Sequence, residues 1–213
     1  MAPVPSRPNV SFLASHNGTN MRVIVAACRA GKLTANPSVL ISNNADSGAM
    51  AWATQNEIPA NHISAASEAS EEAADAAITA TLRRYETDLV VMAGYMRKLG
   101  PETLSAFADR ILNVHPALLP KYGGKGMYGR FVHDTVLKSG DLETGVTIHL
   151  VDGVYDHGPV VVQAPVKVKP GDTVETLTAR VQAKEQELFP ETLRRIVSGE
   201  IDLDKIAAAD KAV

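Results

Sequence analysis

The sequence predicts an α/β protein built on a doubly wound, mostly parallel β-sheet. Over the first two-thirds of the chain, short apolar runs alternate with segments whose apolar residues recur at helical spacing, a pattern typical of parallel sheets. The run at 88–93 (DLVVMA) is continuously apolar after its first residue, as expected for a strand buried on both faces. After residue 143 the pattern changes. Val146, Ile148 and Leu150 alternate with polar residues, which predicts antiparallel C-terminal strands.

Local signals place each element in turn. Gly31 marks the end of the first helix, Pro101 opens a short one, and Thr173 caps the last. The expected strands cover residues 9–14, 38–42, 59–63, 88–93, 110–113, 146–150 and 160–163. The expected helices cover residues 20–32, 46–56, 68–85, 101–107, 130–138 and 173–195. Residues 116–129 contain two prolines and four glycines and are expected to form a long loop, and such loops are often functional.

Length and composition indicate a single domain spanning residues 1–213. We expect a flexible leader at 1–8 and a weakly structured tail at 201–213. Apolar residues make up 45% and charged residues 21%, which excludes a disordered or coiled-coil protein. The net charge of -3 argues against a general nucleic-acid or membrane binder, because such proteins usually carry a basic excess.

The single cysteine, Cys28, cannot form a disulfide within the chain, so we expect a reducing compartment and a cytoplasmic protein. No apolar run approaches the roughly 18 residues that span a bilayer, and the leader MAPVPSRPN lacks the apolar region of a secretory signal. The six histidines show no ligand spacing typical of a metal site, so no metal is expected.

Polar clusters follow three of the expected parallel strands, at 15–20 (SHNGTN), 94–99 (GYMRKL) and 113–120 (NVHPALLP). Open α/β sheets bind ligands at the carboxyl ends of their strands, so these clusters form the candidate site. In the first cluster, Gly18 would let a phosphate approach the free N–H groups of a helix start. An Asn-Gly turn followed by a helix cap explains the same residues. The cluster matches neither the dinucleotide fingerprint nor a Walker loop.

Asn113 and His115 lie on the same side of an extended chain, where an amide and an imidazole can stabilise a developing oxyanion. A hydrogen-bonded histidine before a proline is the plainer interpretation. Asp156 lies in a turn, where an aspartate usually bonds its own backbone. A hydrolase triad would also use Asp and His, but the chain has no G-x-S-x-G nucleophile elbow.

Together these residues resemble the phosphoribosylglycinamide formyltransferases, folate-dependent enzymes of purine synthesis. The resemblance runs from Val10 to Ser198. The motifs that carry it are NGTN (17–20), AGYMRKL (93–99), LNVHPALLPKY (112–122), GVTIH (145–149), the DxGP turn at Asp156 and ARVQxxE (179–185). The central block followed by the turn aspartate is specific for formyltransferases that use formyltetrahydrofolate.

The resemblance implies a formyltransferase-like variant of the Rossmann fold, with 10-formyltetrahydrofolate as cosubstrate and no metal. It implies that the substrate, phosphoribosylglycinamide, binds through its phosphate to Gly18, Thr19 and Asn20, and that its ribose faces Gln182 and Glu185. The implied folate-binding residues are Met96, Arg97, Lys98, Leu99, Asn113, Asp152, Gly153, Val154, Tyr155 and Asp156. The implied catalytic residues are Asn113, His115 and Asp156.

The resemblance also implies a mechanism. The substrate amine attacks the formyl carbon directly, and Asn113 and protonated His115 stabilise the tetrahedral oxyanion. Asp156 keeps His115 charged, and a bound water carries the proton from the amine to the folate nitrogen.

Three positions depart from the family pattern. His16 replaces a glycine of the first loop, residues 70–72 (SEE) lack an arginine that is often found there, and Lys98 replaces an apolar residue of the pterin wall. We expect these departures to affect substrate affinity more than the class of reaction.

Two other interpretations remain open. One is a different formyltetrahydrofolate enzyme. A methionyl-tRNA formyltransferase would need a further C-terminal domain and a formyltetrahydrofolate hydrolase an N-terminal one, while a sugar-nucleotide N-formyltransferase fits NGTN and QxxE less well. The other is a catalytically inactive binding module, which the retention of Asn113, His115 and Asp156 disfavours. We expect small-molecule substrates, no nucleic-acid or membrane partner, and a monomer or homodimer.

Overall fold

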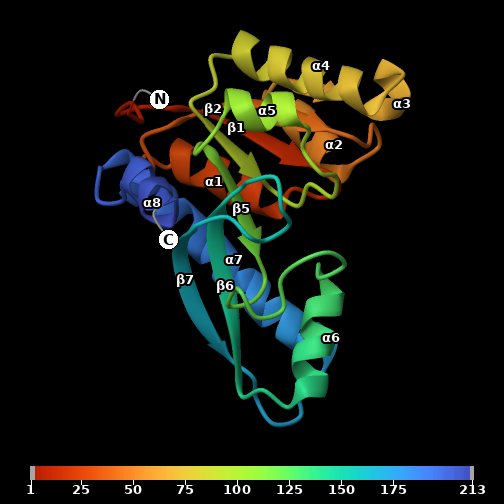
Figure 1. Ribbon diagram of the computed structural model, residues 1–213, viewed down its shortest axis with the longest axis vertical. Coiled ribbons are helices and arrows are strands. Elements are labelled where there is room, and N and C mark those ends of the chain that lie inside the picture. Colours follow the sequence, from red (N-terminus) through yellow and green to blue (C-terminus); the bar gives the residue numbers. More distant parts are fainter. Residues whose placement is uncertain (1–2, 212–213) are drawn as a thin grey trace.

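The computed structural model of the chain describes residues 3–211. Within that range seven strands form one sheet in the order β3-β2-β1-β4-β5-β6-β7 (Figure 1). They are β1 (Asn9–Ala14), β2 (Asn36–Ser42), β3 (Ala60–His62), β4 (Leu89–Met92), β5 (Ile111–His115), β6 (Glu143–Leu150) and β7 (Val160–Lys167). Neighbours from β3 to β5 are parallel, whereas β6 runs antiparallel to β5 and β7. The predicted fold class is confirmed.

Helices cover both faces of the sheet (Figure 1). They are α1 (Thr19–Arg29), α2 (Gly48–Gln55), α3 (Ala65–Glu68), α4 (Glu71–Arg84), α5 (Pro101–Ala106), α6 (Arg130–Ser139), α7 (Val174–Val197) and α8 (Leu203–Asp210). One core packs the sheet against α1, α2, α7 and α8, and a second packs it against α4 and α5. Phe12 belongs to the first core and its neighbour Leu13 to the second, because successive strand residues face opposite sides. This explains the continuously apolar strands.

The helix expected at 68–85 begins later, as α4 at Glu71, and Glu68 is the last residue of a separate short helix, α3. Ala69 ends α3 with a left-handed φ of 73°. Ser70 then caps α4 with its hydroxyl, which accepts a hydrogen bond from the backbone N–H of Ala73 at 3.0 Å. Serine side chains compete with helical backbone bonds and favour caps, and here they override the helical pattern of the surrounding alanines.

Strand β5 extends two residues beyond its expected end at Asn113. The extension follows from pairing with β6, which places Asn113 opposite His149 and His115 opposite Thr147. Residues two apart in a strand face the same side of the sheet, so Asn113 and His115 share one face, as the sequence predicts.

The expectation of a weakly structured tail at 201–213 is wrong for the described part of that segment. Helix α8 begins after Asp202, whose carboxylate accepts hydrogen bonds from the N–H groups of Asp204 and Lys205. Leu203 and Ala207 are buried against the sheet. Buried Arg110 forms an ion pair with Asp204 at 2.8 Å. A cap and two apolar anchors hold the helix, although its sequence is only weakly amphipathic.

The predicted leader at 1–8 contains no helix or strand over residues 3–8. Val4 packs against the first core, and the Arg7 side chain donates to Asn36 Oδ1 at 2.8 Å. The outermost residues of the leader and the tail, 1–2 and 212–213, lie outside the described range.

Substituting Leu203 tests whether α8 contributes to the stability of the domain. Leu203 is only 3% exposed, so Leu203→Ala should lower the free energy of unfolding by about 2–4 kcal/mol in urea denaturation. Lys205→Ala on the same helix is the control, because the Lys205 side chain is 85% exposed, and it should change stability by less than about 0.5 kcal/mol. Equal, small effects of both substitutions would show that α8 does not stabilise the fold.

Candidate active site

The polar segments that follow β1 and β4 are joined at the carboxyl edge of the sheet. The Ser15 N–H donates to the Gly94 carbonyl at 3.0 Å. The Ser15 hydroxyl in turn accepts from the Met96 N–H at 2.7 Å and donates to Asn43 at 2.6 Å. These bonds fix the loop that begins at Gly94 beside the loop that begins at Ser15, so the first two polar clusters share one edge, as predicted.

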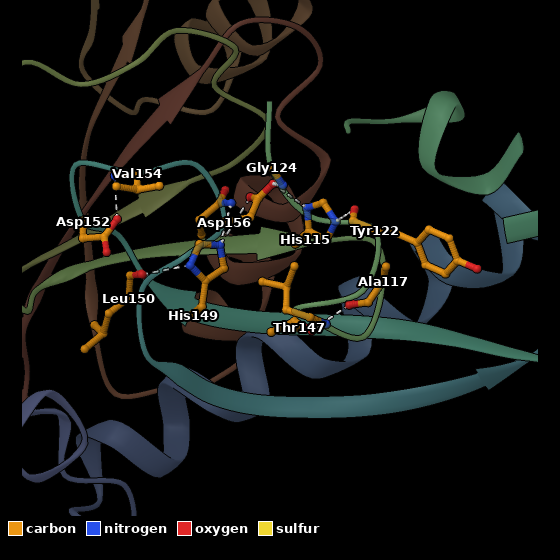
Figure 2. A network of polar contacts seen from close by, with 12 residues as sticks. His115, Ala117, Tyr122, Gly124, Thr147, His149, Leu150, Asp152, Val154 and Asp156 are labelled. Carbon is orange, nitrogen blue, oxygen red and sulfur yellow. Dashed lines mark hydrogen bonds and ion pairs between the residues drawn. The ribbon is translucent and has the colours of Figure 1, made fainter. Parts of the chain in front are cut away.

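At the end of β5, His115 and Asp156 form the centre of a polar network (Figure 2). The His115 ring is buried, and its Nδ1 lies 3.3 Å from Asp156 Oδ2. Its Nε2 lies 2.7 Å from the backbone carbonyl oxygen of Tyr122. A carboxylate and a carbonyl only accept hydrogen bonds, so only the doubly protonated imidazolium donates to both. The geometry therefore favours a positively charged His115.

Asp156 is held as an anion in the same network. Burial alone would raise the pKa of Asp156, but the hydrogen bond and charge of His115 and the Gly124 N–H lower it below its usual value. The Gly124 N–H donates to Asp156 Oδ2 at 3.0 Å. Asp156 itself has a left-handed φ of 54°, which is uncommon for a non-glycine residue. It is therefore more than a turn residue bonded to its own backbone.

His149 is a member of the network to which the sequence assigned no role. Its Nδ1 donates to the Leu150 carbonyl at 2.8 Å, so in the neutral ring Nε2 is an acceptor. The Asn113 side-chain amide donates to that Nε2 at 3.0 Å. Burial lowers the pKa of His149, against the opposing effects of the Leu150 carbonyl and Asp156, which keeps the ring neutral. His149 thus fixes the orientation of the Asn113 amide, and the pairing of the GVTIH strand with β5 is the signal that could have revealed it.

A cleft opens beside this network. Its lining residues are Met92, Arg97, Lys98, Leu99, Asn113, His149, Val151, Asp152, Gly153, Val154, Tyr155 and Asp156. Every residue predicted to bind folate therefore lines the cleft except Met96. Met96 directly precedes the lining residue Arg97 in the sequence, and its side chain is exposed. Next to the cleft, a cavity of about 310 Å³ shares Arg97 and Lys98 as lining residues. A cavity of similar size lies between the leader and the start of β4, and it contains none of the predicted site residues.

The predicted phosphate loop has the backbone expected of an anion site. Gly18 precedes α1 with a left-handed φ of 58°, and no side chain caps the helix start. A Cβ on Gly18 would lie 3.1 Å from the Ala49 side chain, so the position favours glycine. Thr19 is exposed and Asn20 is buried. The side-chain oxygen of Asn20 is buried without a hydrogen-bond partner, which leaves one acceptor unused at the start of α1.

Glu185 links the loop to α7. Asn20 Nδ2 donates to Glu185 Oε2 at 3.3 Å, and burial raises the pKa of Glu185 to about 7, against the opposing effects of Asn20 and His115. Gln182, one helical turn earlier, is exposed. The structure therefore places Glu185 beside Asn20, whereas the Gln182 side chain is exposed to solvent on α7.

Residues 8–193 match the model of a family described as formyl transferase. The chain belongs to this family. Phosphoribosylglycinamide formyltransferase of Escherichia coli K12 is 36% identical over 94% of the chain and 92% of its own length. A chloroplastic enzyme of the same name from Arabidopsis thaliana is 38% identical over 90% of the chain and 66% of its own length. The family resemblance that the motifs predicted is confirmed.

Solved structures agree with the fold of this formyltransferase. The crystal structure of glycinamide ribonucleotide transformylase 1 from Symbiobacterium toebii has a TM-score of 0.85 and 37% identity, covering 91% of the chain and 89% of that structure. Among the described residues of the formyltransferase, no group of three or more His, Cys, Asp or Glu side chains is arranged to hold a metal ion. None of its helices over 3–211 is both long and apolar enough to cross a bilayer.

The raised pKa of Glu185 makes the stability of the formyltransferase depend on pH. Folding favours the neutral acid of Glu185. The stability that this group contributes is complete below its unfolded pKa of roughly 4.3 and is lost as the pH rises through its folded pKa of about 7. Glu185→Gln removes this loss. In urea denaturation the variant should exceed the wild type in unfolding free energy by roughly 1–3 kcal/mol at pH 8.5 and differ little at pH 4.

The control is Glu187→Gln, because Glu187 lies on the same helix with its side chain 71% exposed. It should leave the pH dependence of stability unchanged. If the Glu185→Gln and wild-type curves run parallel from pH 4 to 8.5, Glu185 ionises in the folded state as it does in the unfolded chain.

Proposed function

We propose that the protein transfers the formyl group of 10-formyltetrahydrofolate to the amine of 5′-phosphoribosylglycinamide, a step of purine biosynthesis. The observation that carries the proposal is one polar network that contains Asn113, His149, Asp156 and His115. Asn113 and Asp156 line the cleft, and His115 lies buried behind Asp156. Family membership supports formyl transfer, and the names of the relatives support this substrate. The proposal extends to a cytoplasmic setting, supported by the lone thiol Cys28, and to a monomer or homodimer.

The proposed substrate runs along the carboxyl edge of the sheet. Its phosphate binds the open helix start at Gly18, Thr19 and Asn20, where free N–H groups and the helix dipole attract anions. Its ribose faces Glu185, with Gln182 on the exposed side of the same helix. The pterin of the folate occupies the cleft between the Arg97–Leu99 segment and the Asp152–Asp156 turn.

The proposed chemistry is a direct displacement at the formyl carbon. The unprotonated substrate amine forms the new C–N bond, the carbonyl oxygen takes up negative charge, and the bond to the folate nitrogen then breaks. One N–H of the Asn113 amide donates a hydrogen bond to His149 Nε2, so the second N–H is available to donate to the oxyanion. The His115 charge adds electrostatic stabilisation. A water held by Asp156 carries the amine proton to the departing folate nitrogen.

A coupled assay tests this function. The purified protein is incubated with 10-formyltetrahydrofolate, with and without phosphoribosylglycinamide, and formylated ribonucleotide and free formate are measured separately. Formylated ribonucleotide supports the proposal. Formate released at the same rate without the ribonucleotide would indicate a hydrolase, and binding of either ligand without turnover would indicate an inactive module.

Asp156→Asn tests the charged pair. The substitution keeps the shape of the side chain but removes the anion beside His115, so kcat should fall by roughly 10²–10⁴-fold, the range of a positioned acid–base group. The KM for the ribonucleotide should change little, because its phosphate binds at Gly18. Asp134→Asn is the control, since Asp134 pairs with Lys138 on the outer side of α6. A kcat within a few-fold of the wild type would remove Asp156 from the catalytic machinery.

Thr19→Asp tests the phosphate site without straining Gly18. Thr19 is exposed in the first helical turn, where an added carboxylate is compatible with the helix dipole and folding. The same charge repels a bound phosphate, so the KM for the ribonucleotide should rise roughly 10–100-fold. Thr19→Asn has nearly the same shape without the charge and should raise KM far less. If the two variants have the same KM, the phosphate binds elsewhere.

A further inference from the structure

Tyr122 connects the catalytic histidine to a surface turn outside the cleft. Its backbone carbonyl accepts the hydrogen bond from His115 Nε2 (Figure 2). Its phenol points away from the site, toward the turn between α6 and β6. There the phenolic oxygen lies 2.6 Å from Asp141 Oδ2 and 2.5 Å from the Ser139 hydroxyl. One residue therefore contacts His115 through its main chain and Asp141 through its side chain.

The backbone at Tyr122 leaves the direction of its carbonyl open to control by a side-chain anchor. Tyr122 has a left-handed φ of 59°, a conformation unfavourable for a residue with a Cβ. The next two residues are Gly123 and Gly124, which restrict the backbone least of all residues. A carbonyl between a strained residue and two glycines would turn away from His115 if nothing held the tyrosine in place.

Asp141 is suited to be the anchor. The same carboxylate oxygen that accepts from the Tyr122 phenol also forms an ion pair with Lys121, so one side chain holds two consecutive loop residues. Hydrogen bonds first from Lys121 and then from Tyr122 lower the pKa of Asp141, so the carboxylate stays ionised. The Lys121 ammonium also lies 5.1 Å from the centre of the Tyr122 ring. Asp141 lies at the start of the chain leading into β6, where it lines none of the cavities described above.

We propose that Asp141 is a positioning residue for His115, acting through Tyr122: it holds the Tyr122 carbonyl against the ring and so favours the imidazolium that the reaction needs. The catalytic part of this statement rests on the proposed function. The effect on the protonation of His115 does not, because it is a property of the unliganded protein.

Four other titratable groups face His115 from the surrounding elements. They are Asp156 from the turn after β6, His149 from β6 itself, His133 from α6 and Glu185 from α7. Burial, and to a smaller extent the nearby charge of His115, lower the pKa of His133 to about 4, so His133 is neutral at neutral pH. Within residues 3–211 no ion pair or hydrogen bond joins Asp141 directly to any of these four groups, so substitutions at Asp141 leave their charges in place.

Tyr122→Phe and Asp141→Ala test the proposal in the full-length protein. The phenol is lost in the first variant and its acceptor in the second, so each should free the carbonyl. In ring ¹⁵N NMR of the unliganded protein, assigned with His115→Gln, the His115 titration midpoint should move down by about half to one pH unit. In the transfer assay, kcat should fall roughly 3–10-fold at pH 8 and less than about twofold at pH 6, with the KM for the ribonucleotide unchanged.

Three comparisons make the result decisive. Asp141→Asn keeps an acceptor for the phenol and should restore most of the wild-type titration. The Tyr122→Phe/Asp141→Ala double variant should shift the midpoint no further than either single variant, because both act on one link. Asp134→Ala, which removes an acid from the neighbouring helix α6, should have no effect.

An unchanged His115 midpoint in both single variants would overturn the proposal, and so would additive shifts in the double variant or an equal shift in Asp134→Ala. If the midpoint moves as expected but the wild type forms no formylated ribonucleotide, the positioning role stands and the proposed function fails.

Discussion

The buried His115 ring lies between the Asp156 carboxylate on one side and the Tyr122 carbonyl on the other, and it joins three separate segments of the chain. A charge in the interior is costly unless each of its donors has an acceptor. Strand β5 supplies the ring, the turn after β6 supplies the carboxylate, and the loop after β5 supplies the carbonyl. A neutral ring would leave one of the two acceptors without a donor, so the charged form fits this geometry best.

The scaffold makes this arrangement possible at one position of the sheet. Strand β5 is parallel to β4 on one side and antiparallel to β6 on the other. The antiparallel register places His149 directly opposite Asn113, and the turn that follows β6 returns Asp156 to the carboxyl end of β5. The turn is tight, because a Cβ on Gly158 would lie 2.0 Å from the Leu150 carbonyl oxygen. Glycine is therefore required where the chain returns.

Much of this could be predicted from the sequence, because buried strands and capped helices have strong local signals. The parallel strands, the antiparallel pair and the position of Asn113 and His115 on one face all follow from periodicity. Contacts between distant segments do not. Nothing local shows that His149 accepts from Asn113 or that the Tyr122 carbonyl reaches His115, because both depend on the register and path of the folded chain. Helix α8 was missed for a related reason, since its stability comes from docking Leu203 and Ala207 rather than from its own sequence.

The contact between Asn20 and Glu185 places a titratable group beside the helix start that we propose binds the substrate phosphate. A carboxyl group whose pKa is about 7 is divided between its acid and its anion at neutral pH. A phosphate dianion that arrives at the neighbouring helix start would favour the acid, so its binding would draw a proton from solvent instead of meeting a fixed negative charge. If the phosphate binds at this helix start, as proposed, its affinity carries a proton stoichiometry between zero and one, set by the pH of the surroundings rather than by the shape of the site.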